Sequence, residues 1–294
     1  MTIGSHPPDT GASARETWRL CQDGHLMHEA FYIPSGAGRF ESTPATAGPW
    51  SEELQHGGPP AALLAHVLER HEPAPELRAA RITVDVLGPI PVAPLEVVAR
   101  TIRPGRRIQE VGAELSANGR VVARASLWRL ATLSGQPELL EGAPPPDQVP
   151  PLPESGTWTP DYPGGHFDGY LSAVEGRPVS EGAGAGTVWI RQRVPLVAGE
   201  ETSPLSRTLV VADSGSGISV ALNPAEYLFM NVDLSVALFR DPTGEWICLS
   251  ARTTIGNDGT GLVNIELFDS DGAIGSAMQT LLVVPQPGSP TGSQ

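Results

Sequence analysis

The sequence predicts an α+β protein built from two units, each an antiparallel sheet wrapped around one central helix, with both sheets joined into one. Three observations predict it. The chain of 294 residues exceeds a typical single domain. A strand-rich pattern occurs twice, in residues 81–130 and 227–284. Each copy follows an apolar segment typical of a buried helix, so we expect two similar units with a pocket at their joint.

Proline and small polar residues mark the boundaries of these units. Residues 1–15 and 285–294 are rich in Pro, Ser, Gly or Thr and are expected to be disordered tails. Residues 134–163 are so dense in proline that an extended linker is expected there. The N-terminal unit is therefore predicted at 16–133 and the C-terminal unit at 164–284.

In the first unit, residues 28–34 and 38–45 have the composition of strands. A helix is predicted to begin near Gly58, because Pro59 and Pro60 lack N–H groups that the first helical turn would leave unsatisfied anyway. Four strands follow within residues 81–130, with a hairpin turn at Asn118-Gly119.

The second unit repeats this order. Residues 166–174 and 186–194 are predicted as strands, and Ser203-Pro204 is predicted to cap a helix over residues 205–213. Four strands follow, the first of them an unbroken strand over residues 229–239.

Aligning the copies shows that they differ at polar positions. The alignment places five residues of the first copy over five of the second: Ala65 over Asp213, Thr83 over Asn231, Asp85 over Asp233, Gly119 over Gly272 and Ser126 over Gln279. Amides inside apolar strands are costly unless they have partners. We therefore expect one active site for each chain, with its polar residues in the second copy.

Charge and composition exclude several classes of function. A net charge of −14 opposes binding to nucleic acid or to an anionic membrane. No apolar run is long enough to span a membrane, and the N-terminus has no hydrophobic signal core. Cys21 and Cys248 lie far apart without metal-ligand spacing. The sequence thus predicts a cytoplasmic protein with no metal and no cofactor.

Five segments resemble the acyl-CoA thioesterase II and thioesterase-like family. They are QHGGPPAALLAHVLER, PGRRIQEVGAELSANGRVVARA, VVADSGSGIS, FMNVDLSVALFR and GSAMQTLLVV. With the strands between them, the resemblance covers nearly all of residues 28–284. It implies a double hotdog fold and hydrolysis of acyl thioesters.

The resemblance also implies a catalytic Asp at the end of the second helix, a Thr or similar residue on the next strand and a Gln on the last strand. By motif these are Asp213, Asn231 and Gln279. Asn231 departs from the family, in which better-studied enzymes carry Thr. Pro59-Pro60 also departs, because those enzymes more usually continue the glycine pair with Gln. A carboxylate and two amides can activate and hold a water molecule.

The other half is expected to supply His56, Gly57 and Gly58 at a helix start that contacts the substrate. Glycine permits a close approach of the thioester, and the helix dipole favours negative charge on its carbonyl oxygen. The Gly58 N–H is the expected donor to that oxygen. A basic turn carrying Arg103, Arg106 and Arg107 either contacts the phosphates of CoA or is simply a solvated turn.

The leading hypothesis is an acyl-CoA thioesterase that hydrolyses fatty or related acyl thioesters by Asp-assisted attack of water. The alternative is a non-catalytic module that binds acyl thioesters or lipids. A hydratase is less favoured, because the sequence has no Gly-Asp-x-Asn-Pro-x-His stretch. Asp213 could also be a plain turn residue at a helix end. Open sheet edges predict a homodimer or a higher homo-oligomer.

Overall fold

The structure is a computed structural model that describes residues 18–20, 26–132, 149–160 and 165–287. The predicted tails lie outside the described residues, except for residues 285–287. The part of the predicted linker from 134 to 148 also lies outside them, as do residues 161–164.

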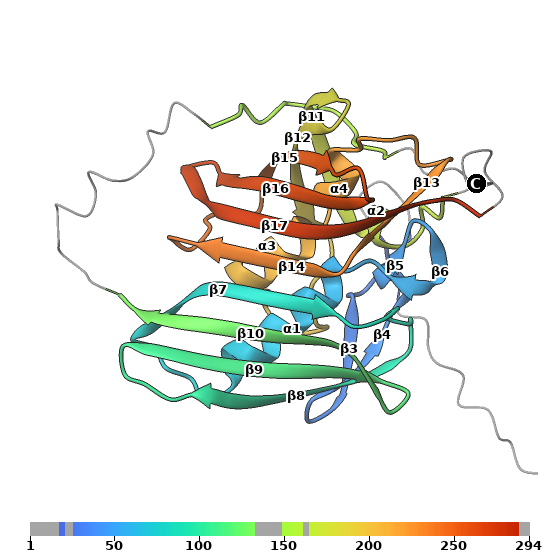
Figure 1. The fold of residues 1–294 in the computed structure, drawn as a ribbon. Coiled ribbons are helices and arrows are strands. Elements are labelled where there is room, and N and C mark those ends of the chain that lie inside the picture. Colours follow the sequence, from blue (N-terminus) through green and yellow to red (C-terminus); the bar gives the residue numbers. More distant parts are fainter. Residues whose placement is uncertain (1–17, 21–25, 133–148, 161–164, 288–294) are drawn as a thin grey trace, which may run out of the picture.

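One sheet of 13 strands runs through both halves of the chain (Figure 1). Its order is β11-β12-β15-β16-β17-β14-β7-β10-β9-β8-β4-β3, and β13 pairs with β17. The strands of this sheet are β3 Tyr32–Gly36, β4 Arg39–Ser42, β7 Leu77–Val86, β8 Pro94–Arg103, β9 Ile108–Ala117, β10 Arg120–Ala131, β11 Val174–Gly182, β12 Ala185–Gln192, β13 Tyr227–Asn231, β14 Asp233–Leu238, β15 Ile247–Ile255, β16 Thr260–Asp269 and β17 Gly272–Pro285. Two small hairpins are formed by β1 Trp18–Leu20 with β2 Leu26–His28 and by β5 Ala47–Gly48 with β6 Ser51–Gln55. The double hotdog prediction is confirmed.

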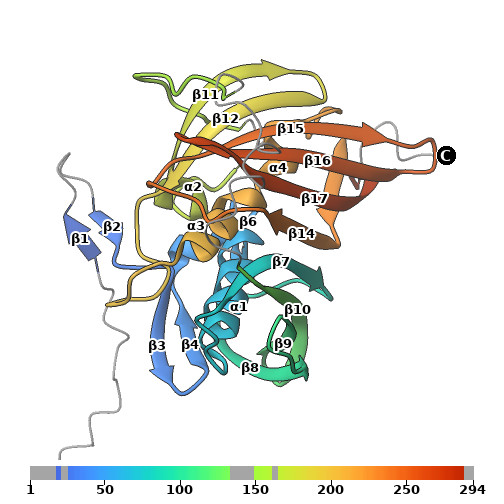
Figure 2. The same ribbon diagram turned by 90° about the vertical axis from the view of Figure 1, so that its left-hand side faces the viewer.

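The helices lie on the concave side of this sheet, here called its inner face (Figure 2). They are α1 Gly58–Arg70, α2 Tyr170–Ala173, α3 Pro204–Ala212 and α4 Gly215–Ile218, and Pro44–Thr46 form a 3-10 turn. As predicted, α1 begins at Gly58, and the Ser203 side chain caps α3 by accepting the N–H of Ser206. Most residues of both long helices are buried, because the helices pack against each other and against the sheet.

Helices α1 and α3 run in opposite directions, so the start of each lies beside the end of the other. At one end, a Cβ on Gly58 would clash with the carbonyl oxygen of Val210. At the other end, the Ser203 hydroxyl donates to the Glu69 carboxylate at 2.5 Å. This packing places the glycine pair of the first half against the last turn of the second helix.

The halves join where β7 pairs with β14 in antiparallel register. Asp85 and Asp233 lie directly opposite each other there. Since these two residues also correspond to each other in the aligned copies, the local two-fold axis relating the halves passes between them. Each carboxylate has a partner that offsets their repulsion: Asp85 accepts from Arg124 at 2.8 Å, and Asp233 accepts the N–H of Thr280 at 2.8 Å.

The strand predicted at residues 166–174 is wrong. Residues 170–173 form the short helix α2, and the strand begins only at Val174. The Ser172 hydroxyl donates to the carbonyl oxygen of Gly169, and the N–H of Ala173 donates to the same oxygen, which closes one helical turn. Local side-chain hydrogen bonds of this kind compete with the sheet ladder.

Residues 149–160 of the predicted linker lie against the C-terminal half. The indole N–H of Trp189 donates to Pro150 at 3.1 Å, and Arg177 on β11 donates to the carbonyl oxygen of Pro153 at 2.9 Å. Among the residues that the structure describes, no helix combines the length and apolar character needed to cross a membrane.

Candidate functional site

Asp213, Asn231 and Gln279 meet at the end of α3. Asp213 follows the last residue of the helix and is buried. Its Oδ1 accepts one hydrogen bond from Asn231 Nδ2 at 2.7 Å and another from Gln279 Nε2 at 2.9 Å. Two amides from different strands therefore hold one carboxylate oxygen of Asp213 in a fixed position.

Gln279 is itself held from both ends of its amide. Its Nε2 also donates to the backbone oxygen of Asp213 at 3.1 Å, while its Oε1 accepts the N–H of Ser216 at 3.2 Å. The side chain is fully buried on the inner face of β17. A buried amide with all these bonds has one orientation, so its N–H groups point at Asp213.

A break in the predicted strand over residues 229–239 turns Asn231 toward Asp213. The structure has two strands there, β13 and β14, separated by a bend at Val232. Leu234 and Val236 are buried on the inner face. Strict alternation would therefore place Asn231 on the outer face. The bend at Val232, whose side chain is 47% exposed, reverses the alternation and brings Asn231 inside.

Two residues aligned with these amides do not occupy matching places. Thr83 faces outward and lies 3.1 Å from the Ser235 hydroxyl, because β7 is unbroken at this point. Ser126 also lies on the outer face. The turn that precedes β17 consists of Ser270 and Asp271, so Asp271 rather than Gly272 corresponds to Gly119, and the alignment there is shifted by one residue. A shift of one residue reverses the face of every side chain in a strand.

His56, Gly57 and Gly58 lie against Asp213 from the other half of the chain. A Cβ on Gly57 would stand 2.6 Å from Asp213 Oδ2, so only glycine leaves room beside this oxygen. Within the described residues, no group donates a hydrogen bond to Oδ2. The carboxylate therefore has one oxygen held by two amides and another that faces the start of α1.

The N–H of Gly58, the predicted donor to the thioester carbonyl, has an acceptor within the protein. Gly58 N–H donates to His56 Nδ1 at 3.1 Å, and Ala61 N–H donates to the carbonyl oxygen of Gly57 at 3.1 Å. Pro59 and Pro60 have no N–H group. The Gly57 N–H makes no hydrogen bond to a described residue. Among the described residues, the Gly58 N–H is thus satisfied, whereas the Gly57 N–H has no acceptor.

Two aromatic residues that the sequence analysis missed surround His56. The rings of His56 and Tyr170 are parallel, with centroids 3.7 Å apart, and Trp50 stacks on His56 at 5.8 Å. The Tyr170 hydroxyl donates to the carbonyl oxygen of Val210 at 3.0 Å and lies 2.9 Å from the Ser214 hydroxyl. Burial lowers the pKa of His56, and the nearby Asp213 opposes this shift.

The structure does not bring Arg103, Arg106 and Arg107 to this site. They are exposed at the end of β8 and in the turn that leads to β9. His71, which follows α1, reaches β8 through its contact with Thr101 at 3.2 Å. Because α1 has 13 residues, its two ends are about 20 Å apart. The arginine turn therefore lies near the end of α1 that is far from Gly57.

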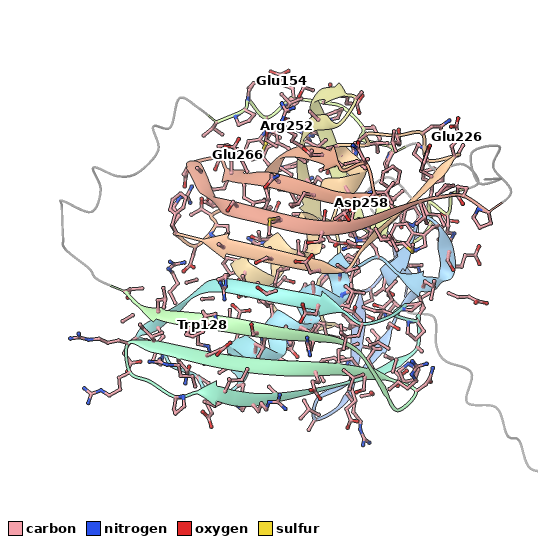
Figure 3. All side chains as sticks on the ribbon, in the orientation of Figure 1. Trp128, Glu154, Glu226, Arg252, Asp258 and Glu266 are labelled. Carbon is pink, nitrogen blue, oxygen red and sulfur yellow. The ribbon has the colours of Figure 1, made fainter. Side chains whose placement is uncertain are left out.

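A separate hollow of about 860 Å³ lies on the outer face of the C-terminal half. Arg252 and Glu266, labelled in Figure 3, stand on this face. Its lining includes none of the nine predicted site residues. Among the residues described here, no group of three or more His, Cys, Asp or Glu is placed to hold a metal ion.

Fold and site together define a double hotdog protein with one polar centre at the joint of its halves. Residues 46–130 match the family profile of the acyl-CoA thioesterase N-terminal domain, and residues 146–283 match that of the C-terminal domain. These two matches cover most of the chain. The protein belongs to the thioesterase-like double hotdog family.

Solved structures show the same fold. A thioesterase II candidate from Thermobifida fusca is 18% identical, with a TM-score of 0.67 over 87% of this chain and 96% of that chain. The tesB protein of Mycobacterium avium subspecies paratuberculosis is 13% identical, with a TM-score of 0.65 over 86% and 96%. Acyl-CoA thioesterase II TesB2 from Mycobacterium marinum is 14% identical, with a TM-score of 0.59 over 87% and 96%. No curated protein sequence matches the chain.

Proposed function

We propose that this protein hydrolyses acyl thioesters, with acyl-CoA as the substrate class, at the centre formed by Asp213 and Gly57. The observation that carries the proposal is the unequal use of the two carboxylate oxygens. Oδ1 is held by two amides, whereas Oδ2 faces a glycine whose N–H is free within the described part of the chain. A base beside an oxyanion donor is what thioester hydrolysis requires.

In the proposed reaction, a water molecule lies against Asp213 Oδ2. Its oxygen forms a bond to the carbonyl carbon of the thioester while Oδ2 accepts its proton. The carbon–sulfur bond then breaks, and the thiolate takes up the proton that Asp213 received. The products are a carboxylic acid and a free thiol. The two amide bonds keep Oδ1 occupied, so Oδ2 is the oxygen left to act as a base.

The Gly57 N–H is the proposed donor to the carbonyl oxygen as it gains negative charge. It belongs to the first residue before α1, where the helix dipole also favours negative charge. Removing one such donor typically costs about 10²- to 10³-fold in rate. Contact between CoA phosphates and Arg103, Arg106 or Arg107 stays a prediction, because these residues lie toward the other end of α1.

The test is release of free thiol from a panel of acyl-CoA substrates with different chain lengths. We expect turnover by the native protein and a loss of about 10²- to 10⁴-fold in Asp213→Asn, because a positioned base contributes that much. Asp258→Asn is the matched control, since Asp258 is exposed in the turn between β15 and β16 (Figure 3).

Two results would contradict the proposal. Binding of acyl-CoA without turnover above the Asp213→Asn background would assign the protein to the non-catalytic alternative. Single turnover in ¹⁸O-labelled water separates water attack from attack by Asp213 itself. Label found in the Asp213 carboxylate would overturn the water mechanism while leaving the hydrolase function intact.

A further inference from the structure

We propose that His56 is a positioning residue for the thioesterase centre: as a neutral ring it holds the start of α1 in the active geometry, and its protonation switches the centre off. This inference rests on the proposed function. His56 Nδ1 lies 3.5 Å from Asp213 Oδ2, and its proposed role acts through the backbone of Gly57 and Gly58.

The hydrogen bond from Gly58 fixes the protonation state of His56. Gly58 N–H donates to His56 Nδ1 at 3.1 Å, so Nδ1 must carry a lone pair rather than a proton. A neutral imidazole then has its proton on Nε2. The 3.5 Å separation between Nδ1 and Asp213 Oδ2 is therefore no ion pair while the ring is neutral.

The same bond keeps the Gly57 amide free. His56 Nδ1 accepts the N–H of Gly58, and the next two residues are prolines, which have no N–H group. The His56 backbone N–H donates to the carbonyl oxygen of Thr46 at 2.8 Å, which fixes the backbone position of this residue. Gly57 lies between these two anchored residues, and its Cα position leaves no room for a Cβ beside Oδ2.

The ring cannot easily turn away. His56 is buried and lies between Tyr170, whose ring is parallel within 1°, and Trp50, whose indole is 56% exposed. Tyr170 is in turn bonded to the carbonyl oxygen of Val210 in the last turn of α3. This stack ties the orientation of the imidazole to the helix end that carries Asp213.

Protonation of Nδ1 would break the hydrogen bond from Gly58 and would also occupy Asp213 Oδ2. The new N–H cannot accept from Gly58, so that amide loses its partner. It faces Asp213 Oδ2 at 3.5 Å, and the resulting ion pair would occupy the oxygen that serves as the base. The titratable side chains that face His56 among the described residues are Asp213 from the end of α3 and Tyr170 from α2. Burial lowers the pKa of His56, which favours the neutral ring, while the nearby Asp213 opposes this shift.

Two substitutions distinguish the role of the Nδ1 acceptor from the role of the aromatic ring. His56→Asn retains an acceptor near Nδ1 but does not titrate, whereas His56→Phe retains an aromatic ring for the stack but has no acceptor. We expect kcat of His56→Phe to fall about tenfold to a hundredfold at the pH optimum, with KM little changed. The reason is that the Gly57 N–H is displaced but still present. His56→Asn should stay within about tenfold of the native kcat, because its acceptor can still hold Gly58.

The pH profile is the decisive kinetic readout. In His56→Asn the acid limb of kcat should move down by about one pH unit or more, since a histidine no longer titrates there. His71→Asn, at the far end of α1, is the control and should keep the native profile. An unchanged acid limb in His56→Asn would overturn the inference.

A readout without substrate keeps this inference separate from the proposed function. The ¹⁵N shifts of labelled histidine, with His56 assigned by its absence in His56→Asn, should show the Nε2–H form at neutral pH. The Gly58 amide signal should shift together with the His56 titration. An Nδ1–H form would overturn the inference even in an active enzyme. If the native protein hydrolyses no thioester, the proposed function fails, and these spectra still decide whether His56 holds Gly58.

Discussion

Asn231 Nδ2, at the bend between β13 and β14, donates to Asp213 Oδ1 at the end of α3, at 2.7 Å. Hydrogen bonds to charged groups are worth about 1.5–3 kcal/mol. This bond leaves Oδ2 as the oxygen that faces Gly57. The position of Asn231 depends on the bend at Val232, so a local feature of the backbone decides which carboxylate oxygen can act.

We therefore expect Asn231→Leu to lower kcat by about tenfold to a hundredfold, with a smaller effect on KM, because the carboxylate loses one of its two restraints. Asn231→Thr should retain more activity than Asn231→Leu, since its hydroxyl can still donate. Free-thiol release measures both. Asn264→Leu, on the exposed face of β16, is the control. Equal rates for Asn231→Leu and the native protein would show that Gln279 alone fixes Asp213.

The repeated strand pattern and the apolar helices were sufficient to predict the architecture from the sequence. Burial of one face leaves a strong periodicity in β7 to β10 and in β15 to β17. The start of α1 at Gly58 and the Ser203 cap followed from local chemistry that depends on few neighbours.

Features that depend on distant contacts could not be predicted. Residues 229–239 alternate like one strand, so nothing in the sequence shows the bend at Val232 that places Asn231. Tyr170 lies in a segment whose composition also suits a strand, and its helical turn is stabilised by contacts with α3. The choice of Gly57 over Gly58 as the free donor depends on His56 Nδ1, and a sequence does not show where that atom points.

Gly57→Ala should abolish most of the activity. The new Cβ would lie 2.6 Å from Asp213 Oδ2, and the carboxylate cannot move away easily because two amides hold Oδ1. We expect kcat/KM to fall at least about a hundredfold, the scale of a lost oxyanion donor. Gly88→Ala is the matched control, since its Cβ would meet nothing within 4 Å. Native kinetics in Gly57→Ala would mean that the substrate does not use this space.

Tyr170→Phe is expected to lower the free energy of unfolding and to have little effect on substrate binding. The change removes a buried hydroxyl that donates to Val210 and contacts Ser214, yet it leaves the ring stacked on His56. A buried hydrogen bond contributes about 0.5–1.5 kcal/mol, so the free energy of unfolding should fall by about 1–2 kcal/mol. Urea unfolding measures this loss. An unchanged midpoint would indicate that water replaces the hydroxyl.

The ion pair between Asp269 and Arg240 is expected to make part of the free energy of unfolding sensitive to acid. Asp269 is fully buried, and burial alone would raise its pKa. Hydrogen bonds from Arg240 and from the N–H groups of Thr243 and Asp271 outweigh this effect and lower the pKa. Since the folded-state pKa is lowered, this stabilisation is present above the unfolded-state pKa of about 3.9 and is lost as the pH falls through the folded-state value.

Asp269→Asn leaves Arg240 without its charged partner. Breaking a buried pair typically costs about 3–5 kcal/mol, and Arg240 is partly exposed, so we expect a loss of about 2–3 kcal/mol at pH 7. The difference between the native protein and the variant should shrink as the pH falls below about 4, because protonation removes the same charge from the native protein. Urea unfolding across this pH range measures it, and Asp168→Asn controls for the loss of one exposed carboxylate. A difference that stays constant down to pH values where the native protein unfolds would show that Asp269 acts through hydrogen bonds that its amide replacement cannot make, and not through its charge.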